Sequence, residues 1–422
     1  MSFATRVVIG LVAGLALGAL LAAADSLLAT RVAGVVEPVG SLWLNALRMT
    51  IIPLIVTMLI TGVASAAETA ATGRLAARAL LLFVIVLTAA ALLGSIVTPL
   101  ALAWWPVSPD AAAAFRAGAP GADAIPKLPG LRDWLTNVIP ANPFKAAADG
   151  DMLPLVIFAL FFGFAAARVT ADMRTPLLGF FRAVMETMLV MIRWILWAAP
   201  LGVFALALGV GTRGGVHAAG ALAHYLVLMC TLGVLITVLC YPAAVAFGRV
   251  SLTRFVRALL PAQAVAISTQ SSLASLPAMI TGAQAQLGLP ERVVSLTLPL
   301  AVSLFRITSP LFNISMVIFC AHVYGVELGA TQIAMGVMLA VITNFSVVGL
   351  PSQLTLFNTT VPISLAMGVP LDLLPLLLAV EVIPDIFRTL GNVTGDVAVT
   401  AIVARGAPAE AEQTAPATRS GA

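Results

Sequence analysis

Apolar stretches separated by short polar connections run along most of this chain, and their lengths predict membrane-spanning helices. About 20 consecutive apolar residues suffice for a helix to cross a bilayer. Six spans are expected before the last third of the chain: 3–24, 42–67, 78–104, one that begins at 154–167, 180–211 and 218–247. Residues 103–150 collect Pro, Asp, Arg and Lys instead, which predicts an aqueous loop. Three alanines at 22–24 resemble a signal-peptide cleavage site, but the length of the first stretch favours an uncleaved helix.

Two segments of the last third are too polar in the middle to be simple spans. Residues 261–288 and 334–367 each have two short apolar arms around a Ser- or Gly-containing tip that is followed by proline. Non-helical backbone at membrane depth is tolerated only against protein or water, so this pattern predicts two re-entrant hairpins. Each hairpin precedes a longer apolar helix, at 293–324 and 371–403, as in a transporter built from repeats. We therefore expect an all-α polytopic membrane protein with eight transmembrane helices plus two re-entrant helical hairpins; the alternative is two irregular spans with exposed loops.

Charged and polar side chains form a stripe in the last of these helices. Glu381, Asp385, Arg388, Asn392 and Asp396 are spaced 4, 3, 4 and 4 residues apart. This spacing places them within a sector of roughly 80° on one helix face. Ionisable groups are costly at membrane depth, and they persist there mostly where they line a bundle interior or a water-filled cavity. The stripe is therefore the expected working site.

Composition agrees with a membrane protein and excludes several other classes. Of the 422 residues, 61% are hydrophobic and 9% are charged, against about 25% charged in soluble domains. The formal charge of +4 comes without any basic run interleaved with aromatic residues, so no nucleic-acid partner is expected. The three cysteines and three histidines are scattered without metal-ligand spacing. Residues 209–214 match a dinucleotide-binding string, but they follow a membrane-type helix rather than a strand, and no enzyme is expected.

Arginines between the spans indicate the orientation. Loop arginines are more frequent on the cytoplasmic side of a membrane. Those that fall on one side when the spans are counted are Arg6, Arg74, Arg78, Arg168, Arg174, Arg249, Arg254, Arg257 and Arg405. Both termini are therefore expected in the cytoplasm. The tail at 406–422, rich in Ala, Pro, Glu and Thr, is expected to be disordered.

Several short motifs resemble a known family. Over residues 42–405 the chain resembles the dicarboxylate/amino acid:cation symporter family, of the glutamate-transporter type. The resemblance is carried by segments 49–53, 142–144, 199–205, 215–217, 269–277, 297–300, 349–351 and the highly specific 388–396, Arg-Thr-Leu-Gly-Asn-Val-Thr-Gly-Asp. It implies a homotrimer in the bacterial inner membrane that works as an elevator-type transporter. In that scheme residues 1–253 mainly form scaffold and oligomer contacts, and residues 254–405 form the core transport domain.

The resemblance also implies roles for the stripe. Arg388 resembles the residue that holds the distal carboxylate of the substrate, and Asp385 resembles the residue that holds its α-amino group. The chemistry agrees, because a guanidinium grips a carboxylate with two parallel hydrogen bonds, and Asp385 lies one turn away on the same face. The alternative is that these two residues pair with each other as structure. Further substrate contacts are implied for Thr389, Asn392, Ser309, Ser271, Ser272, Val348 and Gly349.

One helix departs from the family pattern at its sodium ligands. Where the family has Asn-Met-Asp-Gly-Thr, this chain has Phe305-Arg306-Ile307-Thr308-Ser309. Val86 and Leu87 stand where hydroxyl ligands would align, and Gln270 replaces the arginine of many bacterial members. Sodium needs several oxygen ligands. At least one sodium site of the family is therefore expected to be absent.

Arg306 changes the charge balance beside the stripe. The last helix has three acidic groups, Glu381, Asp385 and Asp396, against Arg388, a net charge of −2 if all are ionised. We hypothesise that the Arg306 guanidinium stands where a bound cation would otherwise neutralise the site. Coupling would then fall to a proton on Glu381 or Asp385, because burial disfavours an ionised carboxyl group. The alternative is that Arg306 faces a water-filled crevice or pairs with Asp396 as structure.

Two coupling ions, H⁺ and Na⁺, therefore remain open, and no other cofactor is expected. A residual sodium site could survive at Asn392 and Asp396, and backbone carbonyls of residues 344–347 could form another. The leading functional hypothesis is a secondary active transporter of small dicarboxylates or acidic amino acids. The alternatives are an anion-conducting protein of the same fold and a transport-impaired or sensory membrane protein, which the altered sodium motif suggests.

Overall fold

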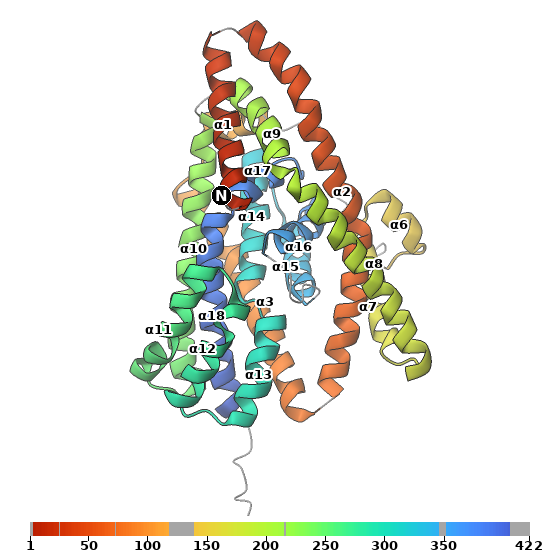
Figure 1. The fold of residues 1–422 in the computed structure, drawn as a ribbon, viewed down its shortest axis with the longest axis vertical. Coiled ribbons are helices and arrows are strands. Elements are labelled where there is room, and N and C mark those ends of the chain that lie inside the picture. Colours follow the sequence, from red (N-terminus) through yellow and green to blue (C-terminus); the bar gives the residue numbers. More distant parts are fainter. Residues whose placement is uncertain are drawn as a thin grey trace, which may run out of the picture.

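The computed structural model describes residues 3–24, 26–71, 73–117, 139–214, 217–345 and 352–405, which form helices and no strands. The first part of the chain forms α1 (Phe3–Ala24), α2 (Ser26–Ala71), α3 (Arg74–Trp104), α4 (Pro109–Ala117), α6 (Pro143–Asp149), α7 (Met152–Ala166), α8 (Ala171–Trp197), α9 (Ala199–Gly214) and α10 (His217–Gly248). The rest forms α11 (Leu252–Thr269), α12 (Ser272–Ala285), α13 (Glu291–Leu304), α14 (Thr308–Tyr324), α15 (Ala330–Asn344), α16 (Ser352–Ala366), α17 (Leu374–Val380) and α18 (Val382–Arg405). Figure 1 shows them as one elongated bundle with the long α2 along one side.

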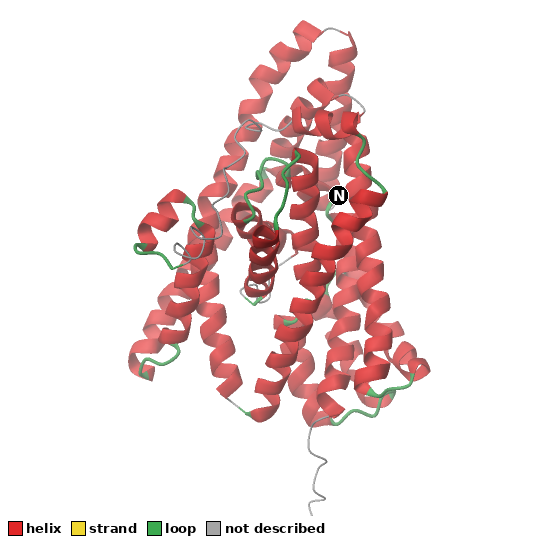
Figure 2. Cartoon of the chain, turned by 180° about the vertical axis from the view of Figure 1, so that it is seen from behind, coloured by secondary structure: helices red, strands yellow, loops and turns green. Residues whose placement is uncertain are grey.

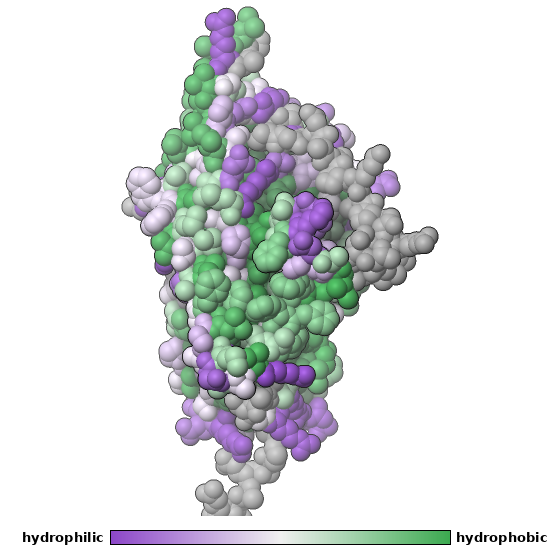
Figure 3. All heavy atoms as spheres, turned by 90° about the vertical axis from the view of Figure 1, so that its right-hand side faces the viewer, coloured by the Kyte–Doolittle hydropathy of each residue, from purple (hydrophilic) through white to green (hydrophobic). Residues whose placement is uncertain are grey.

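Seven helical segments among the described residues are long and apolar enough to cross a membrane, one of which, Glu291–Tyr324, consists of α13 and α14 together. Helix length and composition therefore do not give the eight transmembrane helices that the sequence predicts. The expected fourth span corresponds to α7, which has only 15 residues, and the expected fifth span is divided at Ala198 between α8 and α9. Part of the expected aqueous loop is the helix α4, which buries Ala111 and Phe115. In Figure 3 apolar residues form a broad area over the lower half of the visible face, and hydrophilic residues gather at its lower end and in patches over its upper half.

α1 packs closely along α9. Gly10 and Gly14 of α1 lie against the backbone carbonyls of Pro200 and Phe204 in α9, so closely that a side chain at either glycine would collide. Small residues allow such close approach between helices in membranes. The close approach makes α1 part of the packed bundle.

The first interrupted segment forms a helical hairpin. Its arms α11 and α12 pack side by side and are joined at Gln270 and Ser271. Gln270 has a φ of 51°, in the left-handed region that non-glycine residues seldom adopt, and it ends α11. The Ser271 hydroxyl accepts a hydrogen bond from the first turn of α12 and caps that helix. Gly282 lets the arms approach, because a side chain there would meet the carbonyl oxygen of Ala258. The first arm begins before the predicted residue 261.

The second interrupted segment forms another pair of adjacent helices, α15 and α16. Its predicted tip falls largely at 346–351, so Val348 and Gly349 lie outside the described residues. In Figures 1 and 2 the outer ends of α15 and α16 lie toward the upper end of the molecule, whereas those of α11 and α12 lie at the lower end. The two hairpins thus extend toward the middle of the bundle from opposite ends.

The helices that follow the hairpins are both broken. The apolar pattern predicts single helices, whereas the resemblance implies an unwound segment at residues 305–309 of the first. Residues 305–307 separate α13 from α14, and Glu381 separates α17 from α18. A proline follows each break, Pro310 in the first case and Pro384 in the second. Proline lacks a backbone N–H, and its ring clashes with the carbonyl four residues earlier, so the helix is interrupted there. The first break brings non-helical backbone into the bundle, and Glu381 at the second, which keeps right-handed helical dihedrals, brings a buried charged side chain.

Candidate functional site

The charged stripe lies inside the bundle. The exposed fractions are 3% for Glu381, 6% for Asp385, 4% for Arg388, 6% for Asn392 and 1% for Asp396. The helices that pack most extensively against α18 are α10, α13 and α11. Because water does not solvate these groups, their partners in the protein decide what they can do.

Arg388 lies between two carboxylates and an aromatic ring. Its Nη2 atom forms an ion pair with Oε1 of Glu381, and its Nε atom lies 4.0 Å from Oδ1 of Asp385. The guanidinium carbon lies 4.7 Å from the ring centroid of Phe312 in α14, within the range of a cation–π interaction. The sequence left open that Arg388 pairs with Asp385 as structure. In the structure the shorter contact of Arg388 is with Glu381. The Nε–H has no hydrogen-bond partner within the described part of the chain, so the guanidinium keeps a donor for a second acceptor.

Tyr225 of α10 completes the surroundings of Glu381. Its hydroxyl donates a hydrogen bond of 2.7 Å to Oε2, so each oxygen of this carboxylate has its own partner. Tyr225 is fully buried. The sequence interpretation missed this residue, although a phenol within an apolar span usually finds a hydrogen-bond partner. The chain Tyr225–Glu381–Arg388 thus joins two helices in the interior.

Asn392 holds the start of α14. Its Oδ1 atom accepts hydrogen bonds from the backbone N–H of Thr308 at 3.0 Å and from the Thr308 hydroxyl at 2.8 Å. A side-chain amide oxygen has two lone pairs, and both are used here. Asn392 therefore secures the break between α13 and α14, and its oxygen is not available to a cation in this arrangement.

Asp396 is the most deeply buried carboxylate of the stripe. Neither of its side-chain oxygens has a hydrogen-bond partner among the described residues. Arg306, at the break between α13 and α14, interacts electrostatically with Asp396 and also with Asp385 and Arg388. A buried carboxylate needs a compensating positive charge. Arg306 is the basic residue whose charge acts on Asp396, but neither oxygen of Asp396 receives a hydrogen bond from the described part of the chain, so the burial of this carboxylate is only partly compensated.

Apolar side chains surround this part of the break. Phe305 is buried, with its ring centroid 4.8 Å from that of Phe83 in α3, and Ile307 packs against Gly395 of α18. Leu87 of α3 is also fully buried. These side chains offer no oxygen atoms, so the residues do not fit the sodium site that the family pattern would require. No group of three or more His, Cys, Asp or Glu that could hold a metal ion occurs in the described ranges.

The tip of the first hairpin lies beside the break that precedes α18. The Gln270 side chain lies 3.5 Å from the carbonyl oxygen of Val382, to which it donates. Ser271 and Ser272 are half-buried at this tip. The structure thus brings the predicted residues Ser271 and Ser272, together with Gln270, to the same end of α18 as Glu381 and Asp385.

Other predicted site residues lie near the first break. Ser309 and Thr389 are buried, and the backbone N–H of Ser309 donates to the carbonyl of Arg306 at 2.9 Å. The second hairpin reaches the same region, because Asn344 at the end of α15 donates to the carbonyl of Leu304 at 2.9 Å. Both breaks, the first hairpin tip and an arm of the second hairpin therefore surround the stripe.

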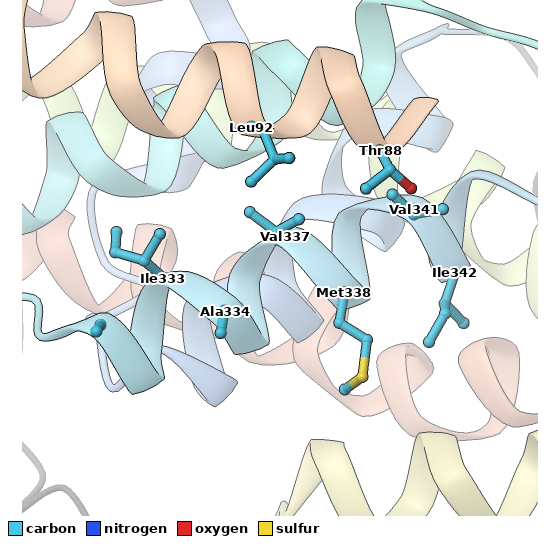
Figure 4. Close-up of a pocket in the computed structure, with 9 residues that line it drawn as sticks. Thr88, Leu92, Ile333, Ala334, Val337, Met338, Val341 and Ile342 are labelled. Carbon is cyan, nitrogen blue, oxygen red and sulfur yellow. The ribbon is translucent and has the colours of Figure 1, made fainter. Parts of the chain in front are cut away.

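An apolar pocket elsewhere does not suit a charged ligand. It lies between α3 and α15, has a volume of about 630 Å³ and is lined by residues such as Leu92, Val337 and Met338 (Figure 4). Thr88 supplies its one hydroxyl, which donates to the carbonyl of Val84 in its own helix. With no charged residue in its lining, this pocket lacks a counter-charge for a carboxylate. The site of interest is therefore the one around Arg388.

Comparison with known proteins gives a consistent result. The model of the sodium:dicarboxylate symporter family matches residues 3–406. The chain is 27% identical over 411 residues to the proton/glutamate-aspartate symporter of Escherichia coli (strain K12), covering 96% of this chain and 92% of that protein. It is 31% identical over 428 residues to the neutral amino acid transporter B(0) of Homo sapiens, covering 92% and 77%. It is also 27% identical over 378 residues to the C4-dicarboxylate transport protein of Rhizobium johnstonii, covering 87% and 82%. The chain therefore belongs to the sodium:dicarboxylate symporter family, a family of membrane transporters and not of enzymes.

Proposed function

We propose that this protein is a secondary active symporter of small dicarboxylates or acidic amino acids. The observation that carries the proposal is the Arg388 guanidinium, which is 4% exposed and lies where two broken helices and a hairpin tip meet. A guanidinium recognises a carboxylate with two parallel hydrogen bonds, and the contact is strong where water is excluded. Relatives that carry glutamate, aspartate or C4-dicarboxylates support this substrate class.

Asp385 would select among such substrates. Its carboxylate is buried one helical turn from Arg388 and suits a substrate ammonium group. We propose that Thr389, Ser309 and the tips of both hairpins line the rest of the substrate site, including Ser271, Ser272, Val348 and Gly349. Asn392 has a supporting role in this proposal, because its side-chain oxygen already binds Thr308.

We further propose an elevator mechanism in a homotrimer of the inner membrane with both termini in the cytoplasm. Residues 254–405 would move against a scaffold formed mainly by residues 1–253. Arg48 of α2 forms an ion pair of 2.9 Å with Asp372, which precedes α17, so this movement would have to break that contact. The orientation is supported by a hydrogen bond of 3.2 Å from Arg405 to the carbonyl of Phe247, which places the end of α18 beside the arginine-rich end of α10.

Coupling is proposed to use protons, with a reduced dependence on sodium. Three carboxylates, on Glu381, Asp385 and Asp396, face two guanidinium groups, on Arg306 and Arg388, which gives a net charge of −1 if all are ionised. One proton on Glu381 would bring this set of five groups to neutrality. The charge of Arg306, which acts on Asp396, would reduce the need for a sodium ion at this position.

A binding screen tests this function. Thermal unfolding of the purified protein would be measured with L-glutamate, L-aspartate, succinate, fumarate and a neutral amino acid, each with sodium and with choline in its place. At least one carboxylate is expected to raise the melting temperature equally in both salts. If no carboxylate stabilises the protein, the anion-conducting or transport-impaired alternative gains support. If stabilisation appears only with sodium, the proposed coupling is wrong.

A further inference from the structure

We propose that Glu381 is an internal ligand of Arg388, which a substrate carboxylate can replace only after Glu381 has taken up a proton. This inference rests on the proposed function, because it concerns the same substrate site. It adds a mechanism in which the empty site is closed by its own carboxylate. Substrate and proton would then bind together because one cannot bind well without the other.

Glu381 occupies a position on Arg388 for which a substrate carboxylate would compete. Its Oε1 atom pairs with Nη2 of Arg388, the kind of contact that a substrate carboxylate would make. Glu381 lies at the break between α17 and α18, and its side chain reaches Arg388, seven residues further along. All three groups of the chain Tyr225–Glu381–Arg388 are buried, so no water can substitute for a lost partner at low cost. A second carboxylate on Arg388 must therefore either share the guanidinium or displace Glu381.

Charge balance favours displacement together with a proton. If a substrate carboxylate joined Arg388 while Glu381 stayed ionised, the buried set would gain one uncompensated negative charge. If a proton from solvent binds Glu381 at the same time, the substrate carboxylate replaces the charge that the proton removes, and the charge paired with Arg388 is unchanged. The net charge of the whole site is then unchanged for an acidic amino acid, whose ammonium group offsets its second carboxylate. One proton is therefore taken up for each carboxylate that engages Arg388.

Protonation of the other ionisable groups near Glu381 would not free Arg388 for a substrate carboxylate. Tyr225 and Cys230 face it from α10, and Asp385 and Arg388 face it from α18. Cys320 of α14 lies beside Tyr225. Asp385 is the other carboxylate near Arg388, but its oxygen is 4.0 Å from Nε and it is the proposed partner of a substrate ammonium. Glu381 is thus the group whose protonation releases the arginine.

Tyr225 has a positioning role in this exchange. It already donates to Oε2 at 2.7 Å, so the oxygen left for the incoming proton is Oε1, the one that pairs with Arg388. Protonation of Oε1 removes the ion pair, while the hydrogen bond to Tyr225 keeps the neutral side chain near α10. The guanidinium is then available to the substrate.

The test is the pH dependence of binding, measured by calorimetry with the carboxylate that stabilises the wild-type protein most. Where Glu381 is ionised in the substrate-free protein, wild-type affinity is expected to fall about tenfold for each unit of rising pH, because one proton is linked to one substrate. Glu381→Gln is expected to remove this slope and to bind more tightly than the wild type at alkaline pH. Glu291→Gln, an exposed position at the start of α13, is the matched control and should keep the wild-type slope.

Tyr225→Phe provides a second variant should Glu381→Gln fail to fold. It removes a hydrogen bond that favours the ionised carboxylate, so the fall in affinity should persist but move to higher pH. An unchanged slope in Glu381→Gln, or an unchanged pH range in Tyr225→Phe, would overturn the internal-ligand proposal while leaving carboxylate binding intact. The proposed function fails in a different way, if the wild-type protein binds no carboxylate at any pH.

Discussion

Arg388→Ala is expected to abolish stabilisation by every carboxylate that stabilises the wild-type protein. The Arg388 guanidinium is 4% exposed and its Nε–H has no hydrogen-bond partner among the residues that the structure describes, so it can hold a substrate carboxylate without help from water. Removing one partner from a buried charged pair generally costs about 3–5 kcal/mol, so affinity should fall by at least about a hundredfold. The measurement is the shift in melting temperature, or the heat of binding, across the panel of carboxylates.

The same substitution should also destabilise the protein without substrate, and this effect can be separated from binding. Arg388→Ala leaves Glu381 buried and without its positive partner. The double variant Arg388→Ala with Glu381→Gln removes both charges and should recover much of the lost stability, but none of the binding. Unchanged affinity in a folded Arg388→Ala variant would mean that the substrate carboxylate is held elsewhere.

Arg306→Ala is expected to destabilise the protein by on the order of 3 kcal/mol near neutral pH. Asp396 is 1% exposed, its oxygens have no hydrogen-bond partner in the described ranges, and Arg306 is the basic residue whose charge acts on it. Without Arg306, stability should increase as pH falls, because protonation of Asp396 removes the uncompensated charge. Thermal unfolding as a function of pH measures both effects.

Arg292→Ala serves as the control, since Arg292 is an exposed arginine at the start of α13. It should be as stable as the wild-type protein at every pH. Replacing sodium by choline should not change the stability of the wild-type protein, whereas added sodium is expected to stabilise Arg306→Ala if the ion can reach Asp396. An Arg306→Ala variant with wild-type stability and no new pH dependence would show that Arg306 does not compensate Asp396.

The sequence predicted the stripe and the first hairpin well, because both depend on local spacing. The 4, 3, 4, 4 pattern requires only helical geometry to bring its members to one face. The Gln270–Ser271 turn combines a left-handed residue with a serine cap, and both lie within the polar tip that the sequence predicted. These features needed no knowledge of distant partners.

The helix breaks were harder to predict, because a proline in an apolar segment can either interrupt the helix or lie within a continuous one. Pro310 and Pro384 follow the two breaks, yet Pro242 and Pro299 lie within the continuous helices α10 and α13. A proline weakens a helix locally, but the surrounding packing decides whether the helix breaks. Propensity alone therefore favoured single helices at both positions.

The partners of the stripe depend on tertiary contacts that one sequence does not reveal. Tyr225 and Glu381 are separated by 156 positions. The two hydrogen bonds from Thr308 to Asn392, separated by 84 positions, turned a predicted sodium ligand into a support for α14. The residue types were enough to predict the net charge of the site, but not which charged side chains would pair with each other.

Transport driven by a proton gradient tests the central claim most directly. The purified protein would be reconstituted into sodium-free liposomes that are more alkaline inside than outside, and uptake of the radiolabelled carboxylate that binds best would be followed. Uptake above equilibrium is expected in the wild-type protein, and it should collapse when a protonophore removes the gradient. Uptake that required sodium and ignored the pH gradient would contradict the account.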